Sequence, residues 1–195
     1  MSPGIFDVDV DSFRRIPPEC QTALFWELSS TAVVEDANFQ KEEWFSSTLL
    51  EWGTCGKLLI DDEHAIGFAQ YAPATLFARL LEFPTGSVSD DAVYLGYCYL
   101  DAKVRGRGLG RWLVGAVARD IVERGYRALE AIGDREWDGG WVLPSSFLGS
   151  SGFTVLKDDP RYPLLRLDTR EEPAPLEAVE TAEVAVPVAE ATGID

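Results

Sequence analysis

A glycine-rich segment between an apolar run and an amphipathic pattern constrains this chain more than any other feature. Gly106, Gly108 and Gly110 stand at alternate positions after the apolar residues 92–100. Residues 108–124 then place apolar side chains at the i, i+3, i+4 spacing of a helix. Glycines let backbone N–H groups approach a ligand, and the first N–H groups of a helix are unpaired at its positive dipole end. The segment therefore predicts an anion site suited to a phosphate.

The charge of this segment is opposite to that of the whole chain. The protein carries a net charge of −16, whereas residues 103–111 hold four basic side chains and no acidic one. This local inversion favours binding of an anion over a role in solubility. A bare glycine turn with surface arginines is the alternative at this point.

Two other phosphate-binding patterns fit the glycines less well. The dinucleotide fingerprint G-x-G-x-x-G would need a glycine where the chain has Arg111. Glu130 lies 20 residues after Gly110, near the place of a ribose-binding acid, so a dinucleotide-binding domain is kept as an alternative. A Walker loop is excluded because no Gly-Lys-Ser/Thr triplet occurs.

The order of the remaining patterns predicts one α/β domain over residues 1–167. In chain order we expect a helix over 17–28, a helix over 39–52, a hairpin over 57–71, a long connection over 73–91, a strand over 92–100, a helix over 108–124, a strand over 127–132, and paired strands over 153–156 and 164–167. Pro17 and Pro18 suit a first helical turn, and Gly53 and Gly125 suit helix ends.

Residues 168–195 differ in kind from the rest. They hold eight acidic residues against one arginine, many Pro, Ala, Glu and Val residues, and no aromatic side chain. Such a segment cannot bury enough apolar surface to offset the entropy of ordering it. We expect an acidic, disordered C-terminal tail.

Composition excludes several classes of partner. A nucleic acid or an anionic membrane would need a basic face, which a chain of net charge −16 does not offer; the acidity favours a cationic partner such as an amine. No apolar run approaches the roughly 20 residues that span a bilayer, and the first residues do not read as a signal peptide. Three cysteines without a C-x-x-C spacing predict a reducing cytoplasm, no disulfide framework and no metal site.

The glycine segment, written Arg105-x-x-Gly108-x-Gly110, resembles the acetyl-CoA motif of the GNAT superfamily of N-acetyltransferases. The resemblance covers about residues 57–167, including the strand order and Gly152-Phe153 before a late strand. It implies a central mixed, mostly antiparallel sheet, splayed between two adjacent strands and flanked by helices. It also implies acetyl-CoA as cofactor and direct transfer of the acetyl group to an amine of a small molecule or peptide in a ternary complex. Dimers are common in the family.

The resemblance assigns roles to residues of this chain. The pyrophosphate would contact the backbone amides of Gly106, Arg107, Gly108, Leu109, Gly110 and Arg111, with added charge from Arg105 and Arg107. The backbone of Tyr99 and Leu100 would pair with the pantetheine arm and aim the acetyl carbonyl. The strand at 127–132 would splay away to admit the thioester, and the amine would enter near the N-terminal helices and the 73–91 connection.

The residue that protonates the leaving thiolate departs from the family pattern. Many relatives carry a Tyr four residues before the glycine of the Gly-Phe pair, and here that position is Leu148. Ser145, Ser146, Ser150 or water are left for this role. The departure keeps open a non-catalytic acyl-CoA-binding or sensor domain beside the acetyltransferase.

Candidate catalytic residues for proton removal are Glu130, Tyr97 and Tyr99. Tyr97 and Tyr99 share one face of their strand because side chains alternate along it, and they could line an acceptor channel or relay a proton. Packing in the core explains the two tyrosines equally well, and a solvent-facing carboxylate explains Glu130.

Overall fold

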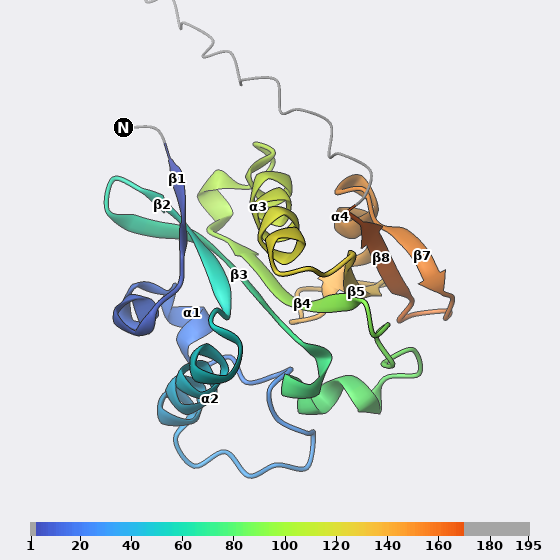
Figure 1. Ribbon diagram of the computed structural model, residues 1–195, viewed down its shortest axis with the longest axis horizontal. Coiled ribbons are helices and arrows are strands. Elements are labelled where there is room, and N and C mark those ends of the chain that lie inside the picture. Colours follow the sequence, from blue (N-terminus) through green and yellow to red (C-terminus); the bar gives the residue numbers. More distant parts are fainter. Residues whose placement is uncertain (1–2, 170–195) are drawn as a thin grey trace, which may run out of the picture.

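A mixed sheet of eight strands forms the centre of the computed structural model, which describes residues 3–169 (Figure 1). The strands are β1 (Gly4–Asp7), β2 (Gly56–Asp61), β3 (His64–Ala72), β4 (Ala92–Leu100), β5 (Ala128–Asp134), β6 (Leu143–Pro144), β7 (Thr154–Lys157) and β8 (Leu164–Asp168). Their order is β1-β2-β3-β4-β5-β8-β7, and β6 pairs with β5 off this path. Neighbours are antiparallel except β4–β5 and β5–β6, which are parallel.

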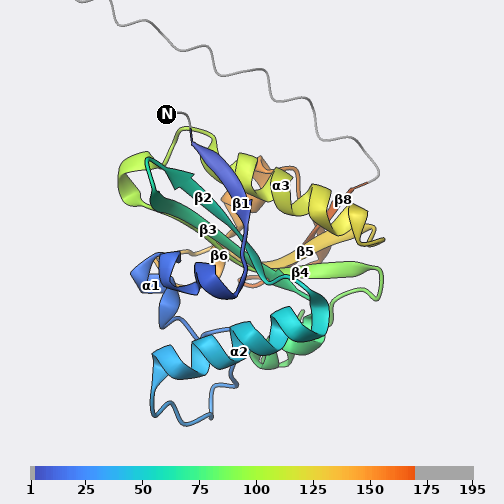
Figure 2. The ribbon, with the colours of Figure 1, turned by 60° about the vertical axis from the view of Figure 1, so that its left-hand side comes forward.

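Helices cover both faces of the sheet, with α3 on one side and α1 and α2 on the other (Figure 2). The α-helices are α1 (Pro18–Gln21), α2 (Ala37–Trp52), α3 (Leu109–Glu123) and α4 (Ser145–Ser150), and the 3-10 helices are η1 (Val10–Arg15), η2 (Ala74–Leu76), η3 (Ala78–Glu82) and η4 (Ala102–Val104). Within residues 3–169, no helix is long and apolar enough to cross a bilayer.

The core follows the alternation of side chains along the strands. Leu59, Tyr71 and Leu95 face α3 and pack with its buried residues, whereas Leu58 and Phe68 face the other side and pack under α1 and α2. The fold class expected from the sequence is therefore confirmed: an α/β domain with a mixed, mostly antiparallel sheet between helices.

Two of the predicted helices form for local reasons. At the start of α2, the Asp36 carboxylate accepts a hydrogen bond from the Phe39 amide at 3.0 Å. The helix ends at Gly53, whose φ of 86° closes the last turn in the left-handed region. Helix α3 ends in the same way, at Gly125 with φ 86°.

The helix predicted over 17–28 is wrong beyond Gln21. Residues after α1 form turns instead, and these turns bury Trp26 and Glu27 against elements far away in the chain. The Trp26 ring packs against Tyr94 at 5.2 Å and Phe83 at 5.1 Å between centroids. Tertiary packing of these side chains overrides a local preference for helix.

Seven short elements were not anticipated: β1, η1, η2, η3, η4, β6 and α4. The long connection at 73–91 contains η2 and η3. Strand β8 extends through Asp168, and the Thr169 amide donates to the Arg127 carbonyl at 3.0 Å, so these two residues belong with the sheet. The remainder of the expected tail, 170–195, lies outside the described residues.

The two parallel strands β4 and β5 separate after a short contact. Their pairing is limited to three positions, and its last pair is Tyr94 with Glu130. Beyond it β4 continues beside β3, while β5 pairs with β6 at Gly133 and Leu143. A register shift against β3 skips Gly96, so β4 carries a bulge just past the point of separation. The sheet is thus open between β4 and β5.

One polar cluster connects α3 to the sheet. The Asp120 carboxylate on α3 accepts hydrogen bonds from Lys57 Nζ at 3.0 Å, Tyr71 Oη at 2.9 Å and Arg124 Nε at 2.6 Å. Burial raises the pKa of Asp120, but the hydrogen bonds from Lys57, Arg124 and Tyr71 outweigh it, and the pKa lies below the usual value of a carboxyl.

We predict that Asp120→Asn lowers the free energy of unfolding by about 1–3 kcal/mol at pH 7, because the amide cannot accept all three hydrogen bonds. A carboxyl whose folded pKa is depressed stabilises the protein above its unfolded pKa, about 3.9, and this contribution is lost as pH falls through the folded pKa. Urea unfolding of the wild type and the variant at pH 7 and pH 3 measures the loss of unfolding free energy at each pH. The loss should be smaller at pH 3 than at pH 7. An equal loss at both pH values, or an equal loss in the exposed control Asp90→Asn, would contradict the role of the Asp120 carboxylate.

Candidate active site

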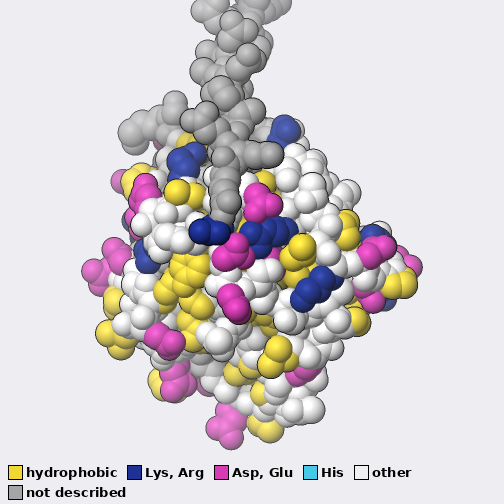
Figure 3. Space-filling view, turned by 45° about the vertical axis from the view of Figure 1, so that its right-hand side comes forward, with side chains coloured by type: hydrophobic (Ala, Val, Ile, Leu, Met, Phe, Trp, Pro, Cys, Tyr) yellow, Lys and Arg dark blue, Asp and Glu magenta, His cyan; other side chains and the backbone are white. Residues whose placement is uncertain are grey.

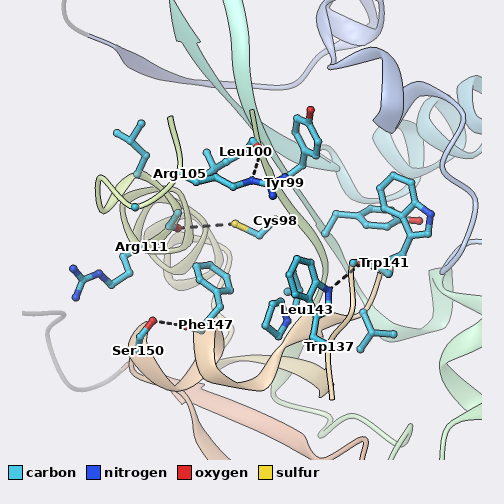
Figure 4. Close-up of a pocket in the computed structure, with 18 of the residues that line it drawn as sticks. Cys98, Tyr99, Leu100, Arg105, Arg111, Trp137, Trp141, Leu143, Phe147 and Ser150 are labelled. Carbon is cyan, nitrogen blue, oxygen red and sulfur yellow. Dashed lines mark hydrogen bonds between the residues drawn. The ribbon is translucent and has the colours of Figure 1, made fainter. Parts of the chain in front are cut away.

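A cavity of about 750 Å³ lies at the opening between β4 and β5 (Figure 4). Its walls come from α1, the end of β4, the glycine segment with the start of α3, the residues from 137 to 144, and α4. The cavity is therefore lined by residues from five separate parts of the chain. It lies where the end of β4 is no longer hydrogen-bonded to β5.

The glycine segment forms one end of this cavity. Gly106 and Gly108 have φ of 79° and 77°, in the left-handed region that side chains rarely adopt. A Cβ added at either position would meet at most one atom, 4.0 Å away, so backbone conformation rather than crowding requires glycine here. Gly108 is the N-cap of α3 and no side chain caps this helix, so the amides of its first turn face the cavity end without a side-chain acceptor.

Basic side chains surround the same end. Arg105 and Arg111 line the cavity; in Figure 4 the Arg105 side chain extends toward Leu100, and the Arg111 side chain points away to the left. Arg105 Nε donates to the Leu100 carbonyl at 3.0 Å, which ties the segment to the end of β4. Arg107 is exposed and does not line the cavity. By contrast, the face in Figure 3 intersperses acidic and basic side chains.

Most of the residues expected at the site line this one cavity. They are Tyr97, Tyr99, Leu100, Arg105, Gly106, Gly108, Leu109, Gly110 and Arg111. Arg107 and Glu130 do not. The 73–91 connection, expected beside the acceptor, also contributes no residue.

Glu130 is a buried structural carboxylate. Its Oε1 accepts from Arg166 Nη1 at 2.9 Å, and its Oε2 accepts from the Ser89 amide at 3.0 Å. Arg166 also pairs with Asp91 and Asp168, so the cluster holds β8, β5 and the residues before β4 together. Both carboxylate oxygens of Glu130 already accept hydrogen bonds, and Glu130 does not line the cavity. We therefore assign it no part in the chemistry of the cavity. The dinucleotide alternative loses the acid that motivated it.

Tyr97 belongs to a buried polar network behind the cavity wall. Its hydroxyl donates to Glu27 Oε2 at 3.0 Å. Glu27 is in turn paired with Lys41, and Gln70 bonds to both, donating to Glu27 Oε1 at 2.6 Å and accepting from Lys41 Nζ at 2.7 Å. Burial, together with the Glu27 carboxylate, raises the pKa of Tyr97 well above its usual value. Tyr97 is therefore neutral and firmly oriented.

Tyr99 lies further along β4, next to Glu19 of α1. Burial first and the Glu19 carboxylate second raise the pKa of Tyr99. Glu19 is exposed and lines the cavity, although no motif in the sequence singles it out. Cys98, between the two tyrosines, also faces the cavity, and burial raises the pKa of its thiol to about 12, so it stays protonated.

Helix α4 supplies the far wall. Leu148 is fully buried in the core beneath α3, whereas Phe147 and Ser150 line the cavity. The Ser150 hydroxyl donates to the Phe147 carbonyl at 2.8 Å. The Phe147 ring packs so closely on α3 that a Cβ at Gly110 would lie 2.9 Å from it. Of the three serines considered from the sequence, Ser150 reaches the cavity and Ser145 and Ser146 do not.

Sequence reasoning missed the aromatic wall formed by Trp137 and Trp141. Trp137 lies within residues 134–140, a polar and glycine-rich stretch of the sequence, and Trp141 follows it directly; the two tryptophans were the available signal. Within residues 3–169, no group of three or more His, Cys, Asp or Glu side chains could hold a metal ion.

Comparison with known proteins identifies the family of this chain. A model of the acetyltransferase (GNAT) family matches residues 18–136. The chain belongs to this family. No curated protein matches its sequence.

Solved structures share the fold at low sequence identity. An N-acetyltransferase from Staphylococcus aureus Mu50 is 16% identical, with a TM-score of 0.59 over 87% of this chain and 99% of that one. The PaiA N-acetyltransferase from Thermoplasma acidophilum, solved with coenzyme A, is 14% identical, with a TM-score of 0.55 over 86% and 99%. YncA, a putative acetyltransferase from Salmonella typhimurium solved with acetyl-CoA, is 16% identical, with a TM-score of 0.57 over 89% and 97%.

We predict that Lys41→Met lowers the free energy of unfolding by about 3–5 kcal/mol, because it leaves the Glu27 carboxylate buried without its cation. The double variant Lys41→Met/Glu27→Gln should recover much of this loss, since a neutral amide can still accept from Tyr97. Chemical denaturation of the three proteins measures the difference. A double variant no more stable than the single one would show that the buried charge is not the cause.

Proposed function

We propose that this protein transfers the acetyl group of acetyl-CoA to the amine of a small molecule or peptide by direct attack in a ternary complex. The observation that carries the proposal is one cavity at the opening between β4 and β5. One end has left-handed glycines, uncapped helix amides and two arginines. The structures of PaiA with coenzyme A and YncA with acetyl-CoA support the choice of ligand.

The glycine segment binds the diphosphate of coenzyme A in this proposal. The backbone amides from Gly106 to Arg111 point at the phosphates, and Arg105 and Arg111 supply charge from the cavity wall. Arg107, outside the wall, adds only long-range charge. Backbone groups at Tyr99 and Leu100, near the end of β4, pair with the pantetheine arm because β5 has already turned away.

The reaction needs positioning more than strong acid or base chemistry. The amine nitrogen attacks the thioester carbonyl carbon, the carbon–sulfur bond breaks, the nitrogen loses a proton, and the departing thiolate gains one. Holding the two reactants together supplies much of the rate. Glu19, the carboxylate in the cavity wall, accepts the amine proton, and Ser150, two residues after the position of the usual Tyr, offers a hydroxyl in the cavity wall.

A non-catalytic acyl-CoA-binding domain is the second candidate. It is favoured by one observation, that the position expected to hold the acid is Leu148, fully buried in the core. The two candidates agree on coenzyme A binding and differ on turnover.

We predict that Gly108→Asp raises the dissociation constant for coenzyme A at least about tenfold, because it adds a negative charge and a strained residue beside the diphosphate. Gly125→Asp is the matched control: this glycine also has a positive φ with open space around it, at the other end of α3. Isothermal titration of the folded variants with coenzyme A measures the effect. Equal affinities for the two variants would contradict the placement of the diphosphate.

We also predict that thiol is released from acetyl-CoA when an acceptor amine is added, with formation of the matching amide. A panel of amines assayed with a thiol reagent, and mass spectrometry of the products, tests this. Tight binding of acetyl-CoA with a flat trace for every acceptor would reject the transferase in favour of the binding domain.

A further inference from the structure

The charged side chains of the cavity wall come from different elements. Arg105 and Arg111 both come from the glycine segment at one end. Glu19 comes from α1, and among the described residues that line the cavity it is the one carboxylate. Glu19 lies beside Tyr99, so the wall attracts a cation there and offers a single charge with which to pair it.

Another part of the cavity wall is built from aromatic rings. Trp137 and Trp141 are 42% and 37% exposed although both line the cavity. The edge of the Trp141 ring packs on Tyr97, with 5.3 Å between centroids and 77° between planes. Trp137 Nε1 donates to the Gly140 carbonyl at 3.2 Å, which fixes the loop that carries both rings (Figure 4). Two positioned tryptophans that remain partly exposed indicate a surface that a ligand covers.

A cation in the cavity would bind to the ring faces of Trp137 and Trp141 rather than to the ring of Tyr97. Lys41 Nζ already lies 4.7 Å from the centre of the Tyr97 ring on its buried side. Trp137 and Trp141 have no such partner among the cation contacts of the described residues, and indole is the aromatic ring that attracts a cation most strongly. An ammonium group in the cavity therefore has an indole face beside Tyr97 to contact, and the Glu19 carboxylate beside Tyr99 is the counter-charge that the same wall offers.

We propose that the acceptor is a primary amine with a single positive charge on an aromatic or bulky apolar body. This inference rests on the proposed function and specifies its substrate. An amino acid is disfavoured, because its carboxylate would face Glu19. A polyamine is disfavoured as well, because its further charges would meet apolar rings and find no second carboxylate in the wall.

Matched acceptors test the substrate class. We expect kcat/KM for phenethylamine to exceed that for phenylalanine, which differs by a carboxylate, and that for spermidine, which adds charges and lacks a ring, by at least about tenfold each, the factor that 1.4 kcal/mol of differential binding gives. A preference for spermidine or phenylalanine would overturn the inference while leaving the transferase in place.

Variants of the wall give a second test. Glu19→Gln and Trp141→Leu should each raise KM for phenethylamine about 3- to 30-fold, the range for losing an ion pair or a cation–π contact at a partly buried site. Glu19→Gln should also lower kcat, because it removes the proposed proton acceptor, whereas Trp141→Leu should leave kcat close to that of the wild type. The dissociation constant for coenzyme A should not change. The exposed residues Glu42 and Phe39 on α2 provide matched controls, Glu42→Gln and Phe39→Leu, with unchanged KM. Unchanged KM in the wall variants, or equal changes in the controls, would contradict the proposal.

Direct binding separates this inference from the proposed function. Phenethylamine titrated into the protein saturated with coenzyme A should give a measurable heat that Trp141→Leu reduces. If this binding occurs but no amine is acetylated, the transferase fails and the amine site stands. If amines are acetylated but phenethylamine binds no better than phenylalanine, the amine site fails and the transferase stands.

Discussion

The separation of β4 from β5 is the constraint on which the rest of the site depends. Parallel pairing stops at Tyr94 and Glu130, so the last residues of β4 have no neighbour on that side. The bulge at Gly96 lies directly beyond this point. Helix α3 then begins at the open end of β4, and α4 closes the far side. A closed sheet would fill the space that the cavity occupies and would leave the glycine segment as a surface turn.

The charged side chains are unevenly distributed around the cavity wall. In a protein of net charge −16, two arginines and the start of α3 make the end at the glycine segment positive, and Glu19 of α1 is the one carboxylate among the described residues of the wall. The neutral, oriented Tyr97 packs against Trp141 and is held by its hydrogen bond to the buried Glu27, which pairs with Lys41. The wall can therefore attract an anionic cofactor and a cationic acceptor to the same opening.

The sequence predicted well what depends on local chemistry. The helix ends at Gly53 and Gly125 and the amphipathic pattern of α3 follow from neighbouring residues, and both form as expected. Features that depend on residues far away in the chain were not predicted. Glu130 pairs with Arg166, 36 residues later, and the turns after α1 form because Trp26 and Glu27 pack against β4 and α2. The sequence also did not indicate that the fold places Trp137 and Trp141 in the cavity wall, where Trp141 packs against Tyr97.

A crystal structure of the protein with coenzyme A tests the central claim most directly. We predict that the diphosphate contacts the backbone N–H groups of residues 106–111. The pantetheine arm should follow the end of β4, and the sulfur should lie in the opening beyond Tyr94, facing the aromatic wall. A diphosphate bound anywhere else, or an arm that passes outside the gap between β4 and β5, would contradict the account.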